Sequence, residues 1–146
     1  MCLQIKKKGL IFASKSPKVK TYNKMLNATK VLVVDDSPAI VDSIEMMLDF
    51  EGFEIEKFYK GSDMLKTLNA DSKPNVILMD MWLSGEDGRD ICKEIKADEN
   101  LKDIPVLIMS ASRGLEQSAL DAGADAFIAK PFDLGDMVDR LKTYAK

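Results

Sequence analysis

Residues 76–88 read VILMDMWLSGEDG, and the order of apolar and acidic residues in this run constrains the rest of the chain. Four consecutive apolar residues after the turn signal Pro74-Asn75 predict a strand that is buried on both faces. The strand ends on Asp80, and the loop that follows closes at Gly88. We therefore expect Asp80 at the carboxyl end of a central strand, which is where open α/β sheets bind their ligands.

Four further strands are expected, at residues 31–34, 53–59, 104–109 and 126–129. Segments with the apolar spacing of helices separate the strands, and this alternation predicts parallel pairing through right-handed crossovers. The expected fold class is α/β, with a doubly wound five-stranded parallel sheet and helices on both of its faces.

The predicted helices differ in how much apolar surface they can bury. The last helix begins near Asp133 and has a firm apolar stripe formed by Leu134, Met137, Val138 and Leu141. The helix expected between residues 114 and 122 can bury only Leu115, Ala119 and Leu120. Because tertiary packing supplies most of the stability of a helix, the second of these should be the more weakly held.

Histidine is absent from the 146 residues. This excludes Ser/His/Asp and Cys/His nucleophiles, histidine-ligated metals and a phosphohistidine on this chain. The two cysteines, Cys2 and Cys92, form neither a disulfide framework nor a Cys-x-x-Cys pair, which suits a reducing compartment. No run approaches the roughly 18 apolar residues of a membrane span, so we expect a cytoplasmic protein.

Charge divides the chain into two parts. Residues 1–28 contain seven lysines and no acidic residue, whereas residues 29–146 contain 14 basic and 24 acidic residues, a formal charge of −10. We expect residues 1–28 to be a basic, poorly ordered extension, and residues 29–146 to be one folded domain. Contact of the extension with nucleic acid, anionic lipid or an acidic partner is the alternative.

Charged and hydroxyl side chains stand where the predicted strands end. Asp35 and Asp36 follow the first strand, Asp80 ends the third, Ser110 ends the fourth and Lys130 ends the fifth. Each one by itself is more often a turn, cap or surface residue. Parallel strands deliver all of them to one edge of the sheet, however, and packing does not explain that convergence.

The chemistry of this edge favours a phosphoryl group and a hard metal ion. Three carboxylates in one place repel one another unless a cation neutralises them, and oxygen ligands without histidine or thiolate favour Mg²⁺, or Mn²⁺. Lys130 adds a compact charge suited to a phosphoryl group. A carboxylate can act as the nucleophile, so Asp80 could form an aspartyl phosphate.

The chain resembles the receiver domain of two-component response regulators, in particular a stand-alone receiver of the chemotaxis type. The resemblance rests on VLVVDD at residues 31–36, VILMDMWLSGEDG at residues 76–88, Ser110-Ala111 and AKPF at residues 129–132, and it extends over residues 29–144. It implies a flavodoxin-like sheet of strand order 2-1-3-4-5.

The resemblance also implies a role for each matching residue at the acceptor. Asp80 matches the phosphoacceptor, and Asp35 and Asp36 match the acidic pair that binds Mg²⁺ together with Asp80. Trp82 matches the residue whose backbone carbonyl is a further metal ligand next to the phosphoryl group. Lys130 matches the lysine that pairs with the acceptor, from a cis peptide bond to proline.

Three positions match the phosphoryl contacts and the switch of the family. Ser110 matches the hydroxyl residue that contacts the phosphoryl group, and Ala111 matches the small phosphate-binding residue that follows it. Phe127 matches the aromatic residue of the switch, whose plain alternative is a core aromatic. In the family the hydroxyl and the aromatic residue move together on phosphorylation.

Members of the family take the phosphoryl group from a phosphohistidine on a sensor histidine kinase or a phosphotransfer protein. The resemblance places the contact with the downstream protein on the fourth helix, the fifth strand and the fifth helix. No DNA-binding domain follows Lys146, so we expect a stand-alone or an excised receiver that catalyses only its own phosphorylation and dephosphorylation.

Two departures and two alternative functions remain. Leu83-Ser84 stands where the family commonly has Met-Pro, which questions the rigidity of the loop, and Trp82 either shields an acyl phosphate or is a plain loop aromatic. A metal-dependent phosphatase is disfavoured because Trp82 occupies the second acidic position of the haloacid dehalogenase motif. A scaffold that is never phosphorylated is disfavoured by the complete set of strand-end residues.

Overall fold

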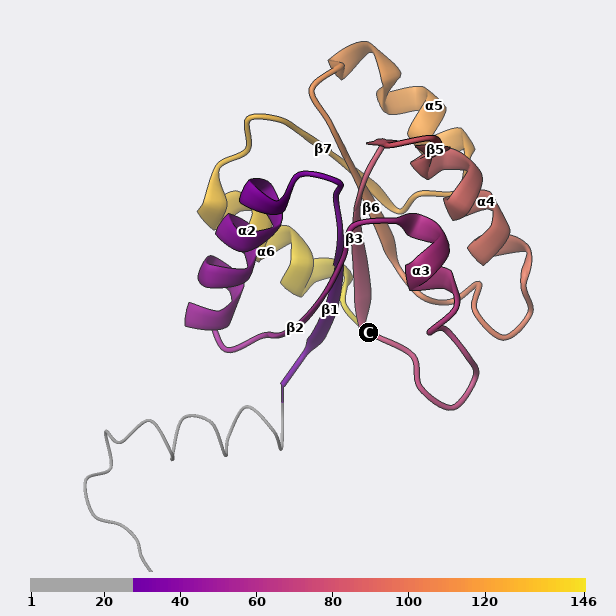
Figure 1. The fold of residues 1–146 in the computed structure, drawn as a ribbon, viewed down its shortest axis with the longest axis horizontal. Helices are drawn as coiled ribbons and strands as arrows, with labels where there is room; N and C mark the ends of the chain where they lie inside the picture. Colours follow the sequence, from indigo (N-terminus) through magenta and orange to yellow (C-terminus); the bar gives the residue numbers. More distant parts are fainter. Residues whose placement is uncertain (1–27) are drawn as a thin grey trace, which may run out of the picture.

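Five parallel strands form the central sheet of the computed structural model, which describes residues 28–146 (Figure 1). The strands are β1 Lys30–Val34, β2 Glu54–Phe58, β3 Val76–Asp80, β6 Val106–Ser110 and β7 Ala126–Ala129. Their order is β2-β1-β3-β6-β7, which confirms the predicted order 2-1-3-4-5. Every residue of β3 and β6 is buried, as continuous apolar runs in a doubly covered sheet require.

The register of the strands brings their carboxyl ends to one edge. Val34 is the partner of both Phe58 and Met79, and Asp80 is the partner of Met109. The residues that follow these positions therefore emerge side by side. This edge carries the strand-end residues that the sequence predicted to converge.

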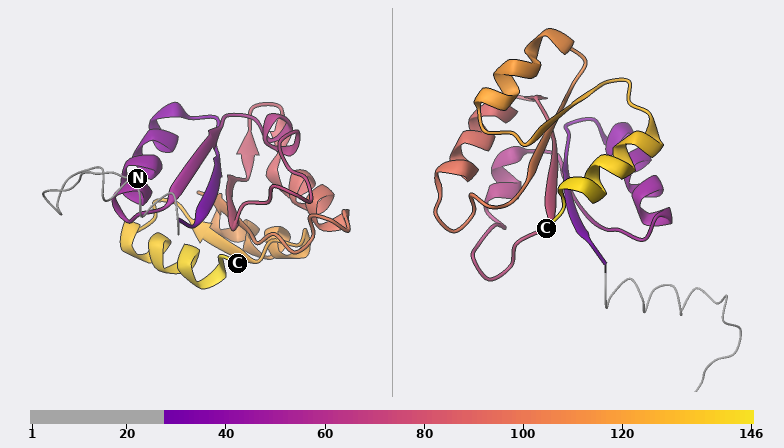
Figure 2. Two further views of the ribbon diagram at one scale, coloured as in Figure 1. Left: turned by 90° about the horizontal axis from the view of Figure 1, so that it is seen from below. Right: turned by 180° about the vertical axis from the view of Figure 1, so that it is seen from behind.

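Helices cover both faces of the sheet, as expected (Figures 1 and 2). One face is covered by α2 Pro38–Phe50 and α6 Leu134–Tyr144. The other is covered by α3 Gly61–Leu65, α4 Gly88–Ala97 and α5 Glu116–Asp121, the last preceded by the 3₁₀ turn Arg113–Leu115. In Figure 1 the first pair lies to the left of the sheet and the second group to the right.

The helices differ in the number of apolar side chains that they bury. Helices α2 and α6 each bury three apolar side chains, which are Val41, Ile44 and Leu48 in α2 and Met137, Val138 and Leu141 in α6. Helix α5 buries Ala119 and no other of its six residues. The prediction of a weakly packed helix in this position is therefore confirmed.

Two inward positions were predicted wrongly. Leu134 is 42% exposed because it is the first residue of α6, where it lines a groove with Met46 and Phe50 of α2 instead of entering the core. Leu120 is 36% exposed because only one side of the short helix α5 meets the sheet. A hairpin that the sequence did not predict, β4 Trp82–Leu83 and β5 Glu86–Asp87, follows β3.

Residues 1–27 lie outside the described part of the chain, and the predicted basic extension falls almost wholly within them. Of the helices in residues 28–146, none has both the length and the apolar character needed to cross a membrane.

Candidate functional site

Three carboxylates meet at the carboxyl edge of the sheet. Asp35 follows β1 and is 1% exposed, and Asp80 ends β3 and is 8% exposed. Asp36 follows Asp35 and is exposed. One carboxylate oxygen from each of the three lies within 4.8 Å of the others. The structure therefore brings together the acidic residues that the sequence placed at two neighbouring strand ends.

Lys130 supplies a positive charge to this cluster. Its backbone N–H donates to the carbonyl oxygen of Ser110 at 2.9 Å, which fixes the residue at the same edge of the sheet. Its Nζ lies 2.8 Å from Oδ1 of Asp80 and 3.0 Å from Oδ2 of Asp35. The peptide bond between Lys130 and Pro131 is cis, as the resemblance predicted.

Burial and charge act in opposite directions on these groups. Burial raises the pKa of Asp80, the hydrogen bond from Lys130 lowers it and the charge of Asp35 raises it again, so the pKa lies above its ordinary value. Burial lowers the pKa of Lys130, but its bonds to Asp80 and Asp35 outweigh burial and raise it overall. Lys130 therefore remains an ammonium and reduces the repulsion between the two buried carboxylates.

Strand β6 delivers a hydroxyl to the same edge. Ser110 is 1% exposed, and its Oγ accepts a hydrogen bond from the N–H of Ser112 at 3.0 Å. Because a hydroxyl also has one hydrogen to donate, Ser110 can still donate to a ligand. Ala111 is exposed beside it. Phe127 of β7 is 6% exposed and belongs to the apolar cluster that includes Ala119 of α5.

The loop of residues 81–87, which follows Asp80, is ordered by the β4–β5 hairpin. Trp82 pairs with Asp87 and Leu83 with Glu86, and Gly85 takes the turn at a φ of 76°, which favours glycine. The sequence has Leu83-Ser84 where the family commonly has Met-Pro, and the backbone pairing of β4 with β5 orders this loop without a proline.

Gly88 closes this loop against the end of strand β3. Its N–H donates to the carbonyl oxygen of Met81 at 2.7 Å. A Cβ at this position would lie 2.5 Å from the carbonyl oxygen of Asp80, so only glycine fits without a shift of the backbone. Glycine is therefore required at the end of the run of residues 76–88, because the backbone at Gly88 lies so close to the backbone of Asp80.

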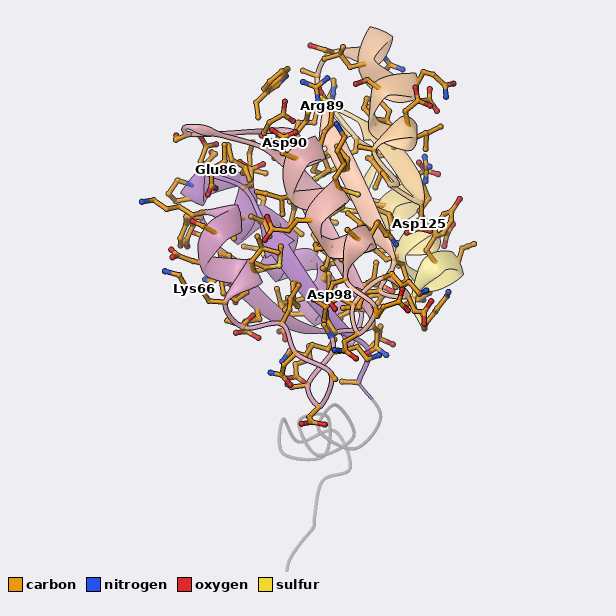
Figure 3. The ribbon with its side chains drawn as sticks, turned by 90° about the vertical axis from the view of Figure 1, so that its right-hand side faces the viewer. Lys66, Glu86, Arg89, Asp90, Asp98 and Asp125 are labelled. Carbon is orange, nitrogen blue, oxygen red and sulfur yellow. The ribbon has the colours of Figure 1, made fainter. Side chains whose placement is uncertain are left out.

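Two loop residues that the sequence did not single out contact neighbouring elements. Ser84 donates its hydroxyl to Oδ2 of Asp36 at 2.6 Å. Glu86 accepts from the backbone N–H groups of Gly61 and Ser62, at 2.7 Å and 3.1 Å, at the start of α3 (Figure 3). Burial raises the pKa of Glu86, but hydrogen bonding to the Ser62 side chain and to the two backbone N–H groups outweighs burial and holds the pKa below its usual range. No sequence spacing marks such contacts.

Trp82 lies at the outer side of the site. Its side chain is 50% exposed, and the guanidinium of Arg89 lies over its ring at 4.9 Å from the ring centre. This distance is typical of a cation–π contact. Trp82 is therefore an exposed aromatic held in place by a neighbouring cation.

The donor set suits a hard divalent cation. Asp35, Asp36 and Asp80 offer carboxylate oxygens, which are the ligands that Mg²⁺ and Mn²⁺ prefer. The three negative charges exceed the single charge of Lys130, so a further cation is electrostatically favoured at this edge. The residues present therefore fit such an ion.

Residues 31–142 match the family described as the response regulator receiver domain. The chain belongs to this family. It is 31% identical over 115 residues to the DNA-binding dual master transcriptional regulator RpaA of Synechocystis sp.. The matched segment covers 77% of this chain and 47% of RpaA. The chain thus spans about half the length of the curated relatives it matches.

Two solved receivers illustrate the structural similarity. The chemotaxis response regulator CheY4 of Vibrio cholerae superposes with a TM-score of 0.72 at 25% identity, covering 81% of this chain and 99% of CheY4. The receiver domain of the sensor histidine kinase PA1611 of Pseudomonas aeruginosa, which has a magnesium ion coordinated in its active-site cleft, gives 0.71 at 28% identity, covering 81% and 98%.

The fold, the family match and the acidic pocket agree with one another. The receiver fold, close to that of stand-alone receivers, is confirmed. The chain is a receiver domain, a phosphoacceptor signalling module of two-component phosphorelay, and its cluster of Asp35, Asp36 and Asp80 is typical of the metal site of receivers.

Proposed function

We propose that Asp80 accepts a phosphoryl group from a phosphohistidine on a sensor histidine kinase or a phosphotransfer protein. The observation that carries the proposal is the position of the Asp80 carboxylate, which is nearly buried at the end of β3, within 2.8 Å of the Lys130 ammonium. Of the three clustered carboxylates, Asp80 is the one on the central strand, between Asp35 and the hydroxyl of Ser110.

The transfer needs a nucleophile and stabilisation of charge. A carboxylate oxygen of Asp80 attacks phosphorus, the bond between phosphorus and the imidazole nitrogen breaks, and the imidazole leaves with the electron pair. Lys130 remains protonated and shifts its ion pair from the carboxylate to a phosphoryl oxygen. The Ser110 hydroxyl and the backbone beside Ala111 donate to the other phosphoryl oxygens.

We propose Mg²⁺ as the resident cation, with Mn²⁺ as a substitute. Asp35, Asp36 and Asp80 would hold it through carboxylate oxygens, together with the backbone carbonyl of Trp82. When bound, the ion offsets negative charge on the phosphoryl group. The hydroxyl of Ser84 orients Asp36, and Lys130 orients Asp35, before any ligand arrives.

The output is a change of surface. Contact of Ser110 with the phosphoryl group would draw its hydroxyl inward and allow Phe127 to change its rotamer against α5. The surface formed by α5, β7 and α6, which correspond to the fourth helix, fifth strand and fifth helix of the prediction, would then differ between two states. Two states separated by a few kcal/mol are enough for such a switch.

Incubation with acetyl phosphate and Mg²⁺, followed by intact-mass measurement, tests the acceptor. The wild type should gain one phosphoryl group, and Asp80→Asn should gain none because an amide is not a nucleophile. Asp103→Asn is the matched control, since this exposed aspartate precedes β6 at the opposite edge of the sheet. Uptake by Asp80→Asn at the wild-type rate would show that another residue is the acceptor.

A further inference from the structure

Arg89 occupies the space between the loop of residues 81–87 and helix α5. It is the second residue of α4, its side chain is about 20% exposed, and it points away from the core toward α5 (Figure 3). Three side chains surround its guanidinium: Asp87 and Trp82 from the loop of residues 81–87, and Ser118 from α5. Each of them engages a different part of the guanidinium.

Asp87 binds the guanidinium as a fork. Nε of Arg89 lies 2.9 Å and 3.2 Å from the two carboxylate oxygens, and Nη2 lies 2.6 Å from Oδ2. The same carboxylate accepts the backbone N–H of Arg89 at 2.9 Å and so caps α4. A bidentate pair of this kind fixes the plane of the guanidinium, which a lysine could not reproduce.

The remaining contacts of the Arg89 guanidinium are with Trp82 in the loop of residues 81–87 and with Ser118 in α5. Its face covers the ring of Trp82, the residue two positions after Asp80. Its Nη1 donates to Oγ of Ser118 in α5 at 2.8 Å. A single rigid group thus touches both the loop beside the acceptor and the helix on the proposed output surface.

Helix α5 is poorly anchored by other means. It has six residues, of which Ala119 is buried, and Leu115 before it is only partly buried. An element with so little buried surface opens at low free energy, so one hydrogen bond from Arg89 is a substantial part of what positions it. The position of α5 is therefore sensitive to the position of the guanidinium.

We propose that Arg89 is a positioning residue that couples the loop beside Asp80 to helix α5 through Ser118. Occupation of the acceptor site shifts the Trp82 backbone, the guanidinium follows the ring and Asp87, and α5 follows the guanidinium. By linkage, whatever holds α5 in one position also changes the affinity of the acceptor site. This inference rests on the proposed function of Asp80 and adds a second route beside that of Ser110 and Phe127.

Backbone amide chemical shifts, recorded with and without beryllofluoride and Mg²⁺, test the coupling. In the wild type, amides of the acceptor site and of residues 116–121 should both shift. In Arg89→Lys and in Ser118→Ala the acceptor-site shifts should remain, while those of residues 116–121 should be roughly halved, because only the route through Ser110 and Phe127 remains. The double variant should lose no more than either single variant.

Gln117→Ala is the matched control, because Gln117 precedes Ser118 and its amide bonds Asp121 within the same helix. It should keep the wild-type response. Shifts of residues 116–121 that stay at the wild-type size in both Arg89→Lys and Ser118→Ala would overturn the coupling but leave the acceptor function standing. An absence of acceptor-site shifts in the wild type would overturn both.

Discussion

Helices α2 and α6 on one face of the sheet bury more apolar side chains than the short helices α3 and α5 on the other face. On one face α2 and α6 have 13 and 11 residues and each inserts three apolar side chains into the core. On the other face α3 has five residues and α5 has six, and side-chain hydrogen bonds from the loop of residues 81–87 and from Arg89 supply part of what holds them. Polar contacts can be rearranged at low cost, whereas packed apolar side chains cannot.

This difference suits a receiver. A switch needs an element that has two positions of similar free energy, on a scaffold that does not move. Helices α2 and α6, together with α4, which buries Ile91, Cys92 and Ile95, provide the scaffold, and the short helix α5 provides the element that responds. The strand-end carboxylates lie between the two faces, because the chain runs from Asp36 into α2 on one face and from Asp80, through the loop of residues 81–87, into α4 on the other.

The largest contrast should come from truncating one leucine on each face. Leu141→Ala removes a fully buried side chain of α6 and should lower the free energy of unfolding by about 2 to 5 kcal/mol. Leu120→Ala removes a side chain of α5 that is 36% exposed and should cost about 1 kcal/mol or less. Urea denaturation of both variants measures the contrast. Equal losses would mean that α5 and α6 are equally well packed.

Magnesium bound by Asp35, Asp36 and Asp80 should stabilise the chain, because the ion binds the folded state and not the unfolded one. At a concentration about 100 times its dissociation constant, one bound ion adds about 2.7 kcal/mol to the free energy of unfolding. The same titration should change the fluorescence of Trp82, the single tryptophan of the chain. Both responses should be lost in Asp36→Ala and kept in Asp103→Asn. Equal responses in Asp36→Ala would place the ion elsewhere.

The smallest effect concerns the carboxylate that holds α3. Because the pKa of Glu86 is lowered in the folded state, its ionised form contributes stability above the pKa of the unfolded chain, and this contribution is lost as pH falls through the folded pKa. Glu86→Gln should cost about 1 kcal/mol or less at neutral pH and flatten the decline of stability below about pH 5. Glu94→Gln, on the exposed side of α4, is the control. A decline of unchanged steepness in Glu86→Gln would contradict the assignment.

Local sequence determined the sheet and the content of the site. Short continuous apolar runs are typical of strands covered on both faces, and strands that alternate with helices favour parallel pairing. Since parallel strands share one carboxyl edge, the residues after each run, Asp35, Asp80, Ser110 and Lys130, had to converge. Gly88 could be recognised as a turn residue, although its close approach to Asp80 could not.

Tertiary structure decided the contacts whose partners are distant in sequence and follow no spacing. The pairing of Trp82 with Asp87, the reach of Glu86 to α3 and the link from Arg89 to Ser118 depend on how the loop of residues 81–87 folds back onto its neighbours. Leu134 and Leu120 carry the apolar pattern of buried residues but are exposed, because helical periodicity specifies a face and not whether a partner covers its end. A pattern of residue types encodes what a segment can bury, and only the assembled chain determines which side chains meet.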